Sequence, residues 1–110
     1  MVAGDGQGGL FAAWQDQRSA PTSSDIWAMH LDAGAGAAAG WAADGNAVCS
    51  AAGFQIAPTL ATDGSGGAYV TWQDRRNNAH YDIYVARVGP AFAPVAGAPT
   101  AAERGRVAST

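Results

Sequence analysis

Two short segments carry tryptophan, aspartate and arginine at the same spacing, and these residue types could bind or position a ligand. The six residues are Trp14, Asp16, Arg18, Trp72, Asp74 and Arg76. In a functional interpretation, Asp and Arg from successive repeated units line a ligand funnel. In a structural interpretation, Trp fills the space between units, while Asp accepts backbone N–H bonds in the following turn and pairs with Arg. The structural interpretation is favoured, because one asymmetric ligand needs different groups from different units.

Carboxylates could also support hydrolysis, which needs a general acid and a base about 5 to 10 Å apart in different environments. Asp16, Asp25, Asp74 and Asp82 are available, but all four belong to the repeated pattern, and the single glutamate, Glu103, lies in the C-terminal tail. The chain contains no recognisable Ser-His-Asp or Cys-His signature. The sequence therefore predicts no catalytic residue.

The two histidines and the single cysteine offer little further chemistry. His30 and His80 have no spacing that makes them a ligand pair, and we expect both on the surface. Cys49 cannot form an intrachain disulfide. A buried apolar position is favoured for it over an intermolecular bridge or a reactive thiol, because free cysteine is among the most buried residue types.

Two glycine-rich loops have the pattern Asp-Gly-x-Gly-Gly, beginning at Asp5 and Asp63. Calcium binding is one interpretation, but calcium takes about six to eight oxygen ligands, and each loop offers one carboxylate. A tight turn is favoured, since glycine adopts positive φ without steric cost. The sequence thus predicts no metal and no other cofactor.

These motifs belong to an internal repeat. Residues 5–18 and 63–76 match at an offset of 58, with eight of fourteen positions identical, and residues 25–31 match 82–88 at an offset of 57. The repeat predicts two units, 1–56 and 57–110. The first begins partway through its leading strand, and the second ends in a degenerate tail.

The composition indicates the elements that position the motifs. The 110 residues include 15 Gly, a single Glu and no Lys, which suits short strands and tight turns better than helices. Strands are expected at 57–61, 68–73 and 81–88, with a weaker one at 46–50, whereas glycines make 33–43 a loop. Four antiparallel strands per period are typical of a β-propeller blade. A β-sandwich is the competing architecture, with cleaner alternation of polar and apolar residues.

The repeated pattern, Asp-Gly-x-Gly-Gly, an aromatic run, Trp-Gln-Asp-x-Arg and Asp-Ile-Tyr/Trp, resembles repeats of secreted or surface-anchored bacterial proteins assigned to sialidase-like β-propellers. The resemblance implies an all-β fold of about two four-stranded antiparallel blades, a partial propeller, in an extracellular or cell-surface protein. The Asp-box of sialidases is not matched in register, because Trp72 comes nine residues after Asp63.

The expected function is a non-catalytic structural or ligand-binding scaffold, with a glycan or another surface polymer as ligand. Trp27, Tyr81 and Tyr84 could stack on sugar rings, although packing between blades is their default role. The alternative is a fragment of a sialidase-like glycoside hydrolase with catalytic residues outside this chain. Further blades, in a longer chain or in identical subunits, are the expected partners. A net charge of −3 argues against nucleic acid, and no apolar run is long enough for a membrane span.

Overall fold

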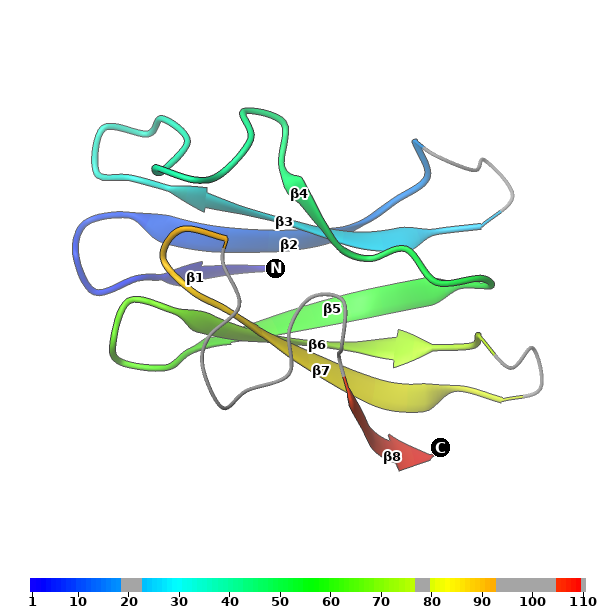
Figure 1. The fold of residues 1–110 in the computed structure, drawn as a ribbon. Coiled ribbons are helices and arrows are strands. Elements are labelled where there is room, and N and C mark those ends of the chain that lie inside the picture. Colours follow the sequence, from blue (N-terminus) through cyan, green and yellow to red (C-terminus); the bar gives the residue numbers. More distant parts are fainter. Residues whose placement is uncertain (19–22, 77–79, 93–104, 110) are drawn as a thin grey trace.

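The chain folds entirely into strands, turns and loops in the part that the structure describes. The computed structural model describes residues 1–18, 23–76, 80–92 and 105–109. The strands are β1 (Val2–Gly4), β2 (Leu10–Asp16), β3 (Asp25–Leu31), β4 (Asn46–Cys49), β5 (Gln55–Thr62), β6 (Ala68–Asp74), β7 (Asp82–Val88) and β8 (Gly105–Ser109). They form two antiparallel sheets, β1-β2-β3-β4 and β5-β6-β7-β8 (Figure 1). The prediction of an all-β chain is confirmed.

Each sheet is a meander in which every strand pairs with the next one along the chain. The central hairpins, β2–β3 and β6–β7, pair over all seven residues of each strand. Both hairpins end on a pair of aspartates, Asp16 with Asp25 and Asp74 with Asp82. The sequence repeat is therefore also a repeat of strand register.

The fourth strand is the least regular part of each sheet. The register of β4 on β3 shifts between Ile26 and Trp27, and that of β8 on β7 shifts between Ile83 and Tyr84. The backbone of β8 completes the second sheet although the tail carries no recognisable copy of the repeat. Glu103 lies outside the described residues.

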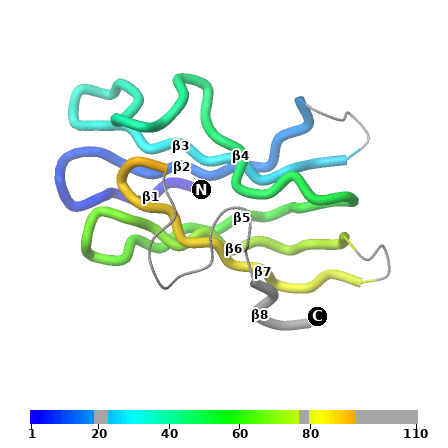
Figure 2. Tube along the Cα trace, viewed as in Figure 1, coloured from blue at the N-terminus to red at the C-terminus, as the bar shows by residue number. Residues whose placement is uncertain are grey.

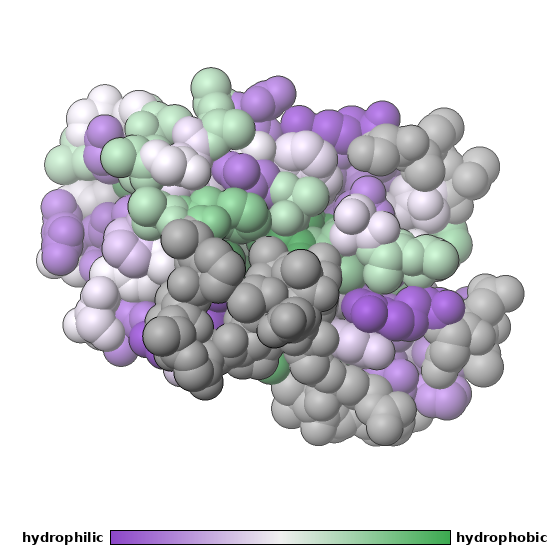
Figure 3. All heavy atoms as spheres, in the orientation of Figure 1, coloured by the Kyte–Doolittle hydropathy of each residue, from purple (hydrophilic) through white to green (hydrophobic). Residues whose placement is uncertain are grey.

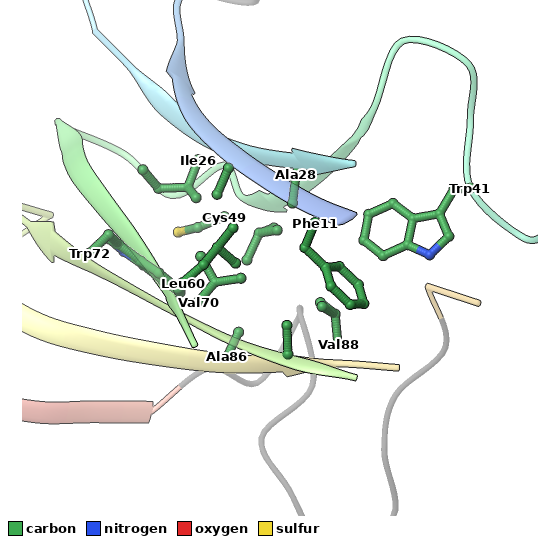
Figure 4. Packing of buried hydrophobic residues seen from close by; sticks show 13 residues of the cluster. Phe11, Ile26, Ala28, Trp41, Cys49, Leu60, Val70, Trp72, Ala86 and Val88 are labelled. Atoms are coloured by element: carbon green, nitrogen blue, oxygen red, sulfur yellow. The ribbon is translucent and has the colours of Figure 1, made fainter. Parts of the chain in front are cut away.

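One hydrophobic core lies between the sheets and draws on both of them (Figure 4). Trp72 and Cys49 lie toward one end of this core, and Phe11 and Trp41 lie toward the other. Its buried members are Phe11, Ala13, Ile26, Ala28, Trp41, Val48, Cys49, Leu60, Ala68, Val70, Trp72, Ala86 and Val88. Cys49 is fully buried, as predicted.

The two sheets meet where their leading strands converge. β5 is the strand of the second sheet that contacts β1, β2 and β3 of the first. The Cα trace shows β1 beside β5 (Figure 2), and β4 and β8 are the last strands in the order of their sheets. On the face seen in Figure 3, hydrophobic residues gather in a band across the middle of the molecule. The core between the sheets extends to β4, through Val48 and Cys49, and to β7, through Ala86 and Val88.

Candidate functional site

The motif of the first sheet closes on its own aspartate at the end of β2. Trp14 Nε1 donates a hydrogen bond to Asp16 Oδ2 at 2.8 Å. Arg18 donates through its backbone N–H to Oδ1 at 2.8 Å and through Nη2 to Oδ2 at 2.8 Å. Residues two positions apart on a strand share a face, so the alternation itself brings Trp14 and Asp16 together.

The second sheet repeats this arrangement at the end of β6. Trp72 Nε1 donates to Asp74 Oδ2 at 3.0 Å. The backbone N–H of Arg76 donates to Oδ1 at 2.9 Å, and its Nη2 donates to Oδ2 at 2.6 Å. The structure therefore brings the six predicted site residues together as two separate triplets, one in each sheet.

Each arginine also stacks on an aromatic ring of the neighbouring strand. The guanidinium carbon of Arg18 lies 3.8 Å from the ring centre of Trp27, and that of Arg76 lies 3.8 Å from the ring centre of Tyr84. Cation–π contacts of this kind hold the guanidinium in place. Stacking by arginine therefore occupies one face of each of two rings that were considered for sugar binding. The sequence signal for this fourth member is the aromatic residue two positions after Asp25 and Asp82.

Hydrogen bonding keeps both motif aspartates ionised. Arg18 is the main cause that holds the pKa of Asp16 well below its usual range. Burial acts to raise the pKa of Asp74, but hydrogen bonds from Arg76 and Trp72 outweigh it, and the pKa is lowered. Neither carboxyl is suited to donate a proton at neutral pH.

Asp25, which pairs with Asp16 across the hairpin, has the opposite electrostatic character. Burial, with the nearby charge of Asp16 in second place, raises the pKa of Asp25. Two carboxyls whose environments push their pKa values apart can divide the acid and base roles. Here the lower-pKa partner already binds the side chains of Trp14 and Arg18, so its capacity to act as a base is reduced.

The two motifs differ in what covers them. The side chain of Asp74 is fully buried, whereas that of Asp16 is 10% exposed. Cys49 of β4 lies over the second motif, with its Sγ 3.4 Å from Arg76 Nη2 and 3.9 Å from Asp74 Oδ2. The first sheet thus supplies the cover for the motif of the second sheet.

A glycine turn lies against the first motif. Gly45 has a φ of 95°, and a Cβ there would lie 2.8 Å from Cη2 of Trp14. The preceding residue, Asp44, accepts a hydrogen bond from Arg18 Nη2 on its carbonyl at 3.2 Å. Only glycine combines this conformation with so close an approach to the indole.

The Asp-Gly-x-Gly-Gly loops are tight turns, as the sequence favoured. In each loop Oδ1 of the aspartate accepts N–H bonds from the residues two and four positions later, at 2.7 and 2.9 Å for Asp5 and at 2.7 and 3.0 Å for Asp63. The backbone N–H of Ser65, followed by the Arg87 guanidinium, lowers the pKa of Asp63 to about 2. The remaining oxygen of each aspartate binds a basic side chain of the third strand.

The prediction that His30 lies on the surface is wrong. His30 is buried, with Nε2 2.8 Å from Asp5 Oδ2 and Nδ1 2.9 Å from the carbonyl oxygen of Pro90, and its ring stacks on Phe11 at 4.1 Å. The signal that could have placed it is its alignment with Arg87, which pairs with Asp63 in the second unit. His80 is exposed, as expected.

The described ranges hold neither a metal-binding cluster nor a membrane-spanning helix. No group of three or more His, Cys, Asp or Glu there could hold a metal ion. Among the same residues, no helix has the length and apolar character needed to cross a membrane.

The fold and the motif define an all-β repeat protein in which two equivalent four-stranded sheets carry the same Trp-Asp-Arg cluster. Comparisons with models of protein families, with curated proteins and with solved structures found no match to this chain. The internal repeat is therefore the basis on which its function is inferred.

Proposed function

We propose that the chain is a non-catalytic structural module of the β-propeller type, in which each sheet serves as one blade. Each sheet is a four-stranded meander, and the chain passes from the last strand of the first sheet to the leading strand of the second. Repetition of such sheets is the architecture of a propeller. The leading strands β1 and β5 lie side by side (Figure 2) and contact each other, as expected of the inner strands of neighbouring blades around one axis.

The observation that carries the scaffold role is that each motif satisfies its own polar groups. Asp16 and Asp74 both accept hydrogen bonds from the Trp and Arg of their own triplet. A ligand would have to displace an arginine that is also stacked on an aromatic ring. Such a cluster fixes the end of a hairpin more readily than it exchanges partners.

Replacement of Arg76 tests the scaffold role. Arg76→Gln leaves the buried Asp74 charge without its guanidinium, so we expect a loss of about 2 to 4 kcal/mol in the free energy of unfolding, measured by urea denaturation. The neighbouring Arg75→Gln is the matched control and should cost much less. Equal stability of Arg76→Gln and the wild type would contradict the scaffold role.

A hydrolase that uses Asp16 and Asp25 of this chain is the second proposal, and the contrast between these two carboxyls favours it. It differs from the sialidase-like glycoside hydrolase fragment expected from the sequence, whose catalytic residues lie outside this chain. Burial raises the pKa of one carboxyl, while Arg18 lowers that of its cross-strand partner. The test is hydrolysis of an aryl glycoside and of a sialoside by the wild type and by Asp25→Asn. Turnover that the substitution abolishes without unfolding would establish the enzyme and replace the scaffold.

The repeated sequence pattern also supports a cellular location and binding partners for the scaffold. The parent is a secreted or surface bacterial protein, and the partners are further blades and a carbohydrate or another surface polymer. Trp27 and Tyr84 each hold an arginine on one ring face, so sugar stacking would need their other face. Binding of the chain to immobilised polysaccharide, compared with Trp27→Ala, tests the carbohydrate.

A further inference from the structure

Each sheet has two faces, and the repeat makes the faces of one sheet equivalent to those of the other. We call one the tryptophan face, which carries the motif Trp and its cross-strand partner, Trp14 with Trp27 or Trp72 with Tyr84. Side chains alternate along a strand, so the residues between them form the opposite face. Phe11 belongs to the opposite face of the first sheet.

The contact inside the chain joins unlike faces. The first sheet contributes its opposite face, with Phe11 and Ile26 fully buried. The second sheet contributes its tryptophan face, with Val70 and Trp72 buried to 0% and 1% exposure. The opposite face of the first sheet therefore packs on the tryptophan face of the second. The sheets are stacked in the same orientation and do not join two identical faces. One such contact leaves the tryptophan face of the first sheet and the opposite face of the second without a facing sheet in the described residues.

The tryptophan face of the first sheet is exposed where its equivalent is covered. Val2 is 60% exposed, whereas Leu60, its counterpart at the offset of 58, is 8% exposed. Val2 pairs with Ala12 as Leu60 pairs with Val70, so both valine and leucine occupy the same place in their sheets. An exposed aliphatic side chain at that place is a cost that a covering sheet removes.

The opposite face of the second sheet carries large apolar side chains at the same positions as the covered opposite face of the first sheet. Tyr69 corresponds to Phe11 but is 40% exposed, and Ile83 corresponds to the fully buried Ile26 and is only partly covered. The polar border is repeated too: Arg87 Nη2 lies 2.8 Å from Asp63 Oδ2, and its guanidinium lies 5.3 Å from the ring of Tyr69.

The fourth strand supports the same correspondence. In the first sheet Cys49 pairs with Ile26, and Cys49 then contacts the motif of the second sheet. In the second sheet Ala108 pairs with Ile83. Ala108 therefore occupies the register position from which Cys49 reaches a neighbouring motif.

From these correspondences we propose that the tryptophan face of the first sheet binds the opposite face of the second sheet of another copy of this chain. The contact reproduces the one inside the chain and is heterologous, so it adds copies head to tail and gives a ring if the rotation closes and a filament if it does not. The proposal rests on the proposed repeat module, because both sheets must be units of one kind.

Two variants are designed so that each blocks one of the two faces that form the proposed contact. Ala12→Arg places a charge on the tryptophan face of the first sheet, and Val85→Arg places one on the opposite face of the second. Wild-type chain should associate in a concentration-dependent manner in sedimentation velocity. Each variant alone should be monomeric, with self-association at least about tenfold weaker, because an unpaired charge is buried. Gln7→Arg, in an exposed turn, is the matched control and should associate like the wild type.

Mixing the two blocked variants gives the decisive measurement. Each retains the end that the other has lost, so an equimolar mixture should form a 1:1 dimer and nothing larger. A monomeric wild type, unchanged association of both variants, or a mixture that stays monomeric would each overturn the proposal. Circular dichroism checks folding, and Val2→Arg and Thr71→Arg replace a variant that unfolds. The Arg76→Gln unfolding result tests the module separately, so the two proposals can fail independently.

Discussion

The two motifs make the same bonds in different surroundings. In both sheets Trp and Arg donate to one aspartate and the arginine stacks on a cross-strand ring. Trp72 is buried to 1% exposure under the first sheet, whereas Trp14 is only partly buried, with the Gly45 turn against it. Strand alternation is enough to form the cluster. The contribution of the cluster to the free energy of unfolding depends on what packs over it. The same substitution should therefore have unequal effects in the two sheets.

The largest difference should come from the tryptophans. Trp72→Ala removes a fully buried indole and should cost about 3 to 5 kcal/mol in the free energy of unfolding. Trp14→Ala, at a partly exposed equivalent position, should cost less than half as much. Urea denaturation of both variants measures the comparison. Equal losses would mean that the first motif is as well covered as the second.

The aspartates should show a smaller difference of the same sign. Asp74→Asn removes a buried charge that pairs with Arg76 and should cost about 2 to 3 kcal/mol. Asp16→Asn, nearer to solvent, should cost less than about 1 kcal/mol. The urea midpoints of the two variants at pH 7 give the answer. A larger loss for Asp16→Asn would reverse the proposed order of burial.

Acid should expose the contribution of the Asp63 loop. The pKa of the Asp63 carboxyl is about 2 in the folded chain, against about 4 in an unfolded chain. A lowered pKa stabilises the fold above the unfolded value, and this contribution is lost as the pH falls toward 2. Asp63→Asn should therefore be less stable than the wild type at pH 7 and should lose less stability between pH 4 and pH 2. Thermal unfolding across that range measures both slopes, and parallel slopes would contradict the prediction.

The smallest effect should come from Asp25, and its sign is reversed. Its pKa is raised by burial and by Asp16, so its contribution is favourable below the unfolded pKa and is lost as the pH rises through the folded one. Asp25→Asn should therefore be slightly more stable than the wild type at pH 7, and the gain should vanish at pH 3. A urea midpoint below that of the wild type at pH 7 would show that the ionised carboxyl is needed.

The features predicted from the sequence are those that depend on neighbours along the chain. Turn residues predicted the aspartate loops, and runs of aromatic and β-branched residues predicted the strands of the β6–β7 hairpin, which the repeat extends to β2–β3. The contacts of Asp with Arg and with the backbone of the following turn could be predicted, because these residues lie two positions apart. The general burial preference of cysteine sufficed for Cys49, without its partner being known.

What the sequence did not reveal depends on contacts between distant segments. His30 is buried because its ring binds Asp5 and the carbonyl of Pro90, 60 residues away. Strand β8 carries no copy of the repeated motif, so the sequence did not indicate it. It pairs with β7 through the backbone, which does not require a particular set of side chains. The unequal cover of the two motifs follows from how the sheets dock, and neither copy of the repeat encodes that by itself.

The order of the strands has a consequence for synthesis on the ribosome. Every strand pairing in the two sheets joins consecutive strands, so the first sheet can form as soon as residues up to Cys49 have emerged. The strands that cover it, β5 and β6, are made afterwards. During that interval the face that carries Phe11 and Ile26 lacks its covering sheet, and the growing chain exposes apolar surface to chaperones and to neighbouring nascent chains. The speed of translation through residues 50–74 sets how long that surface stays open.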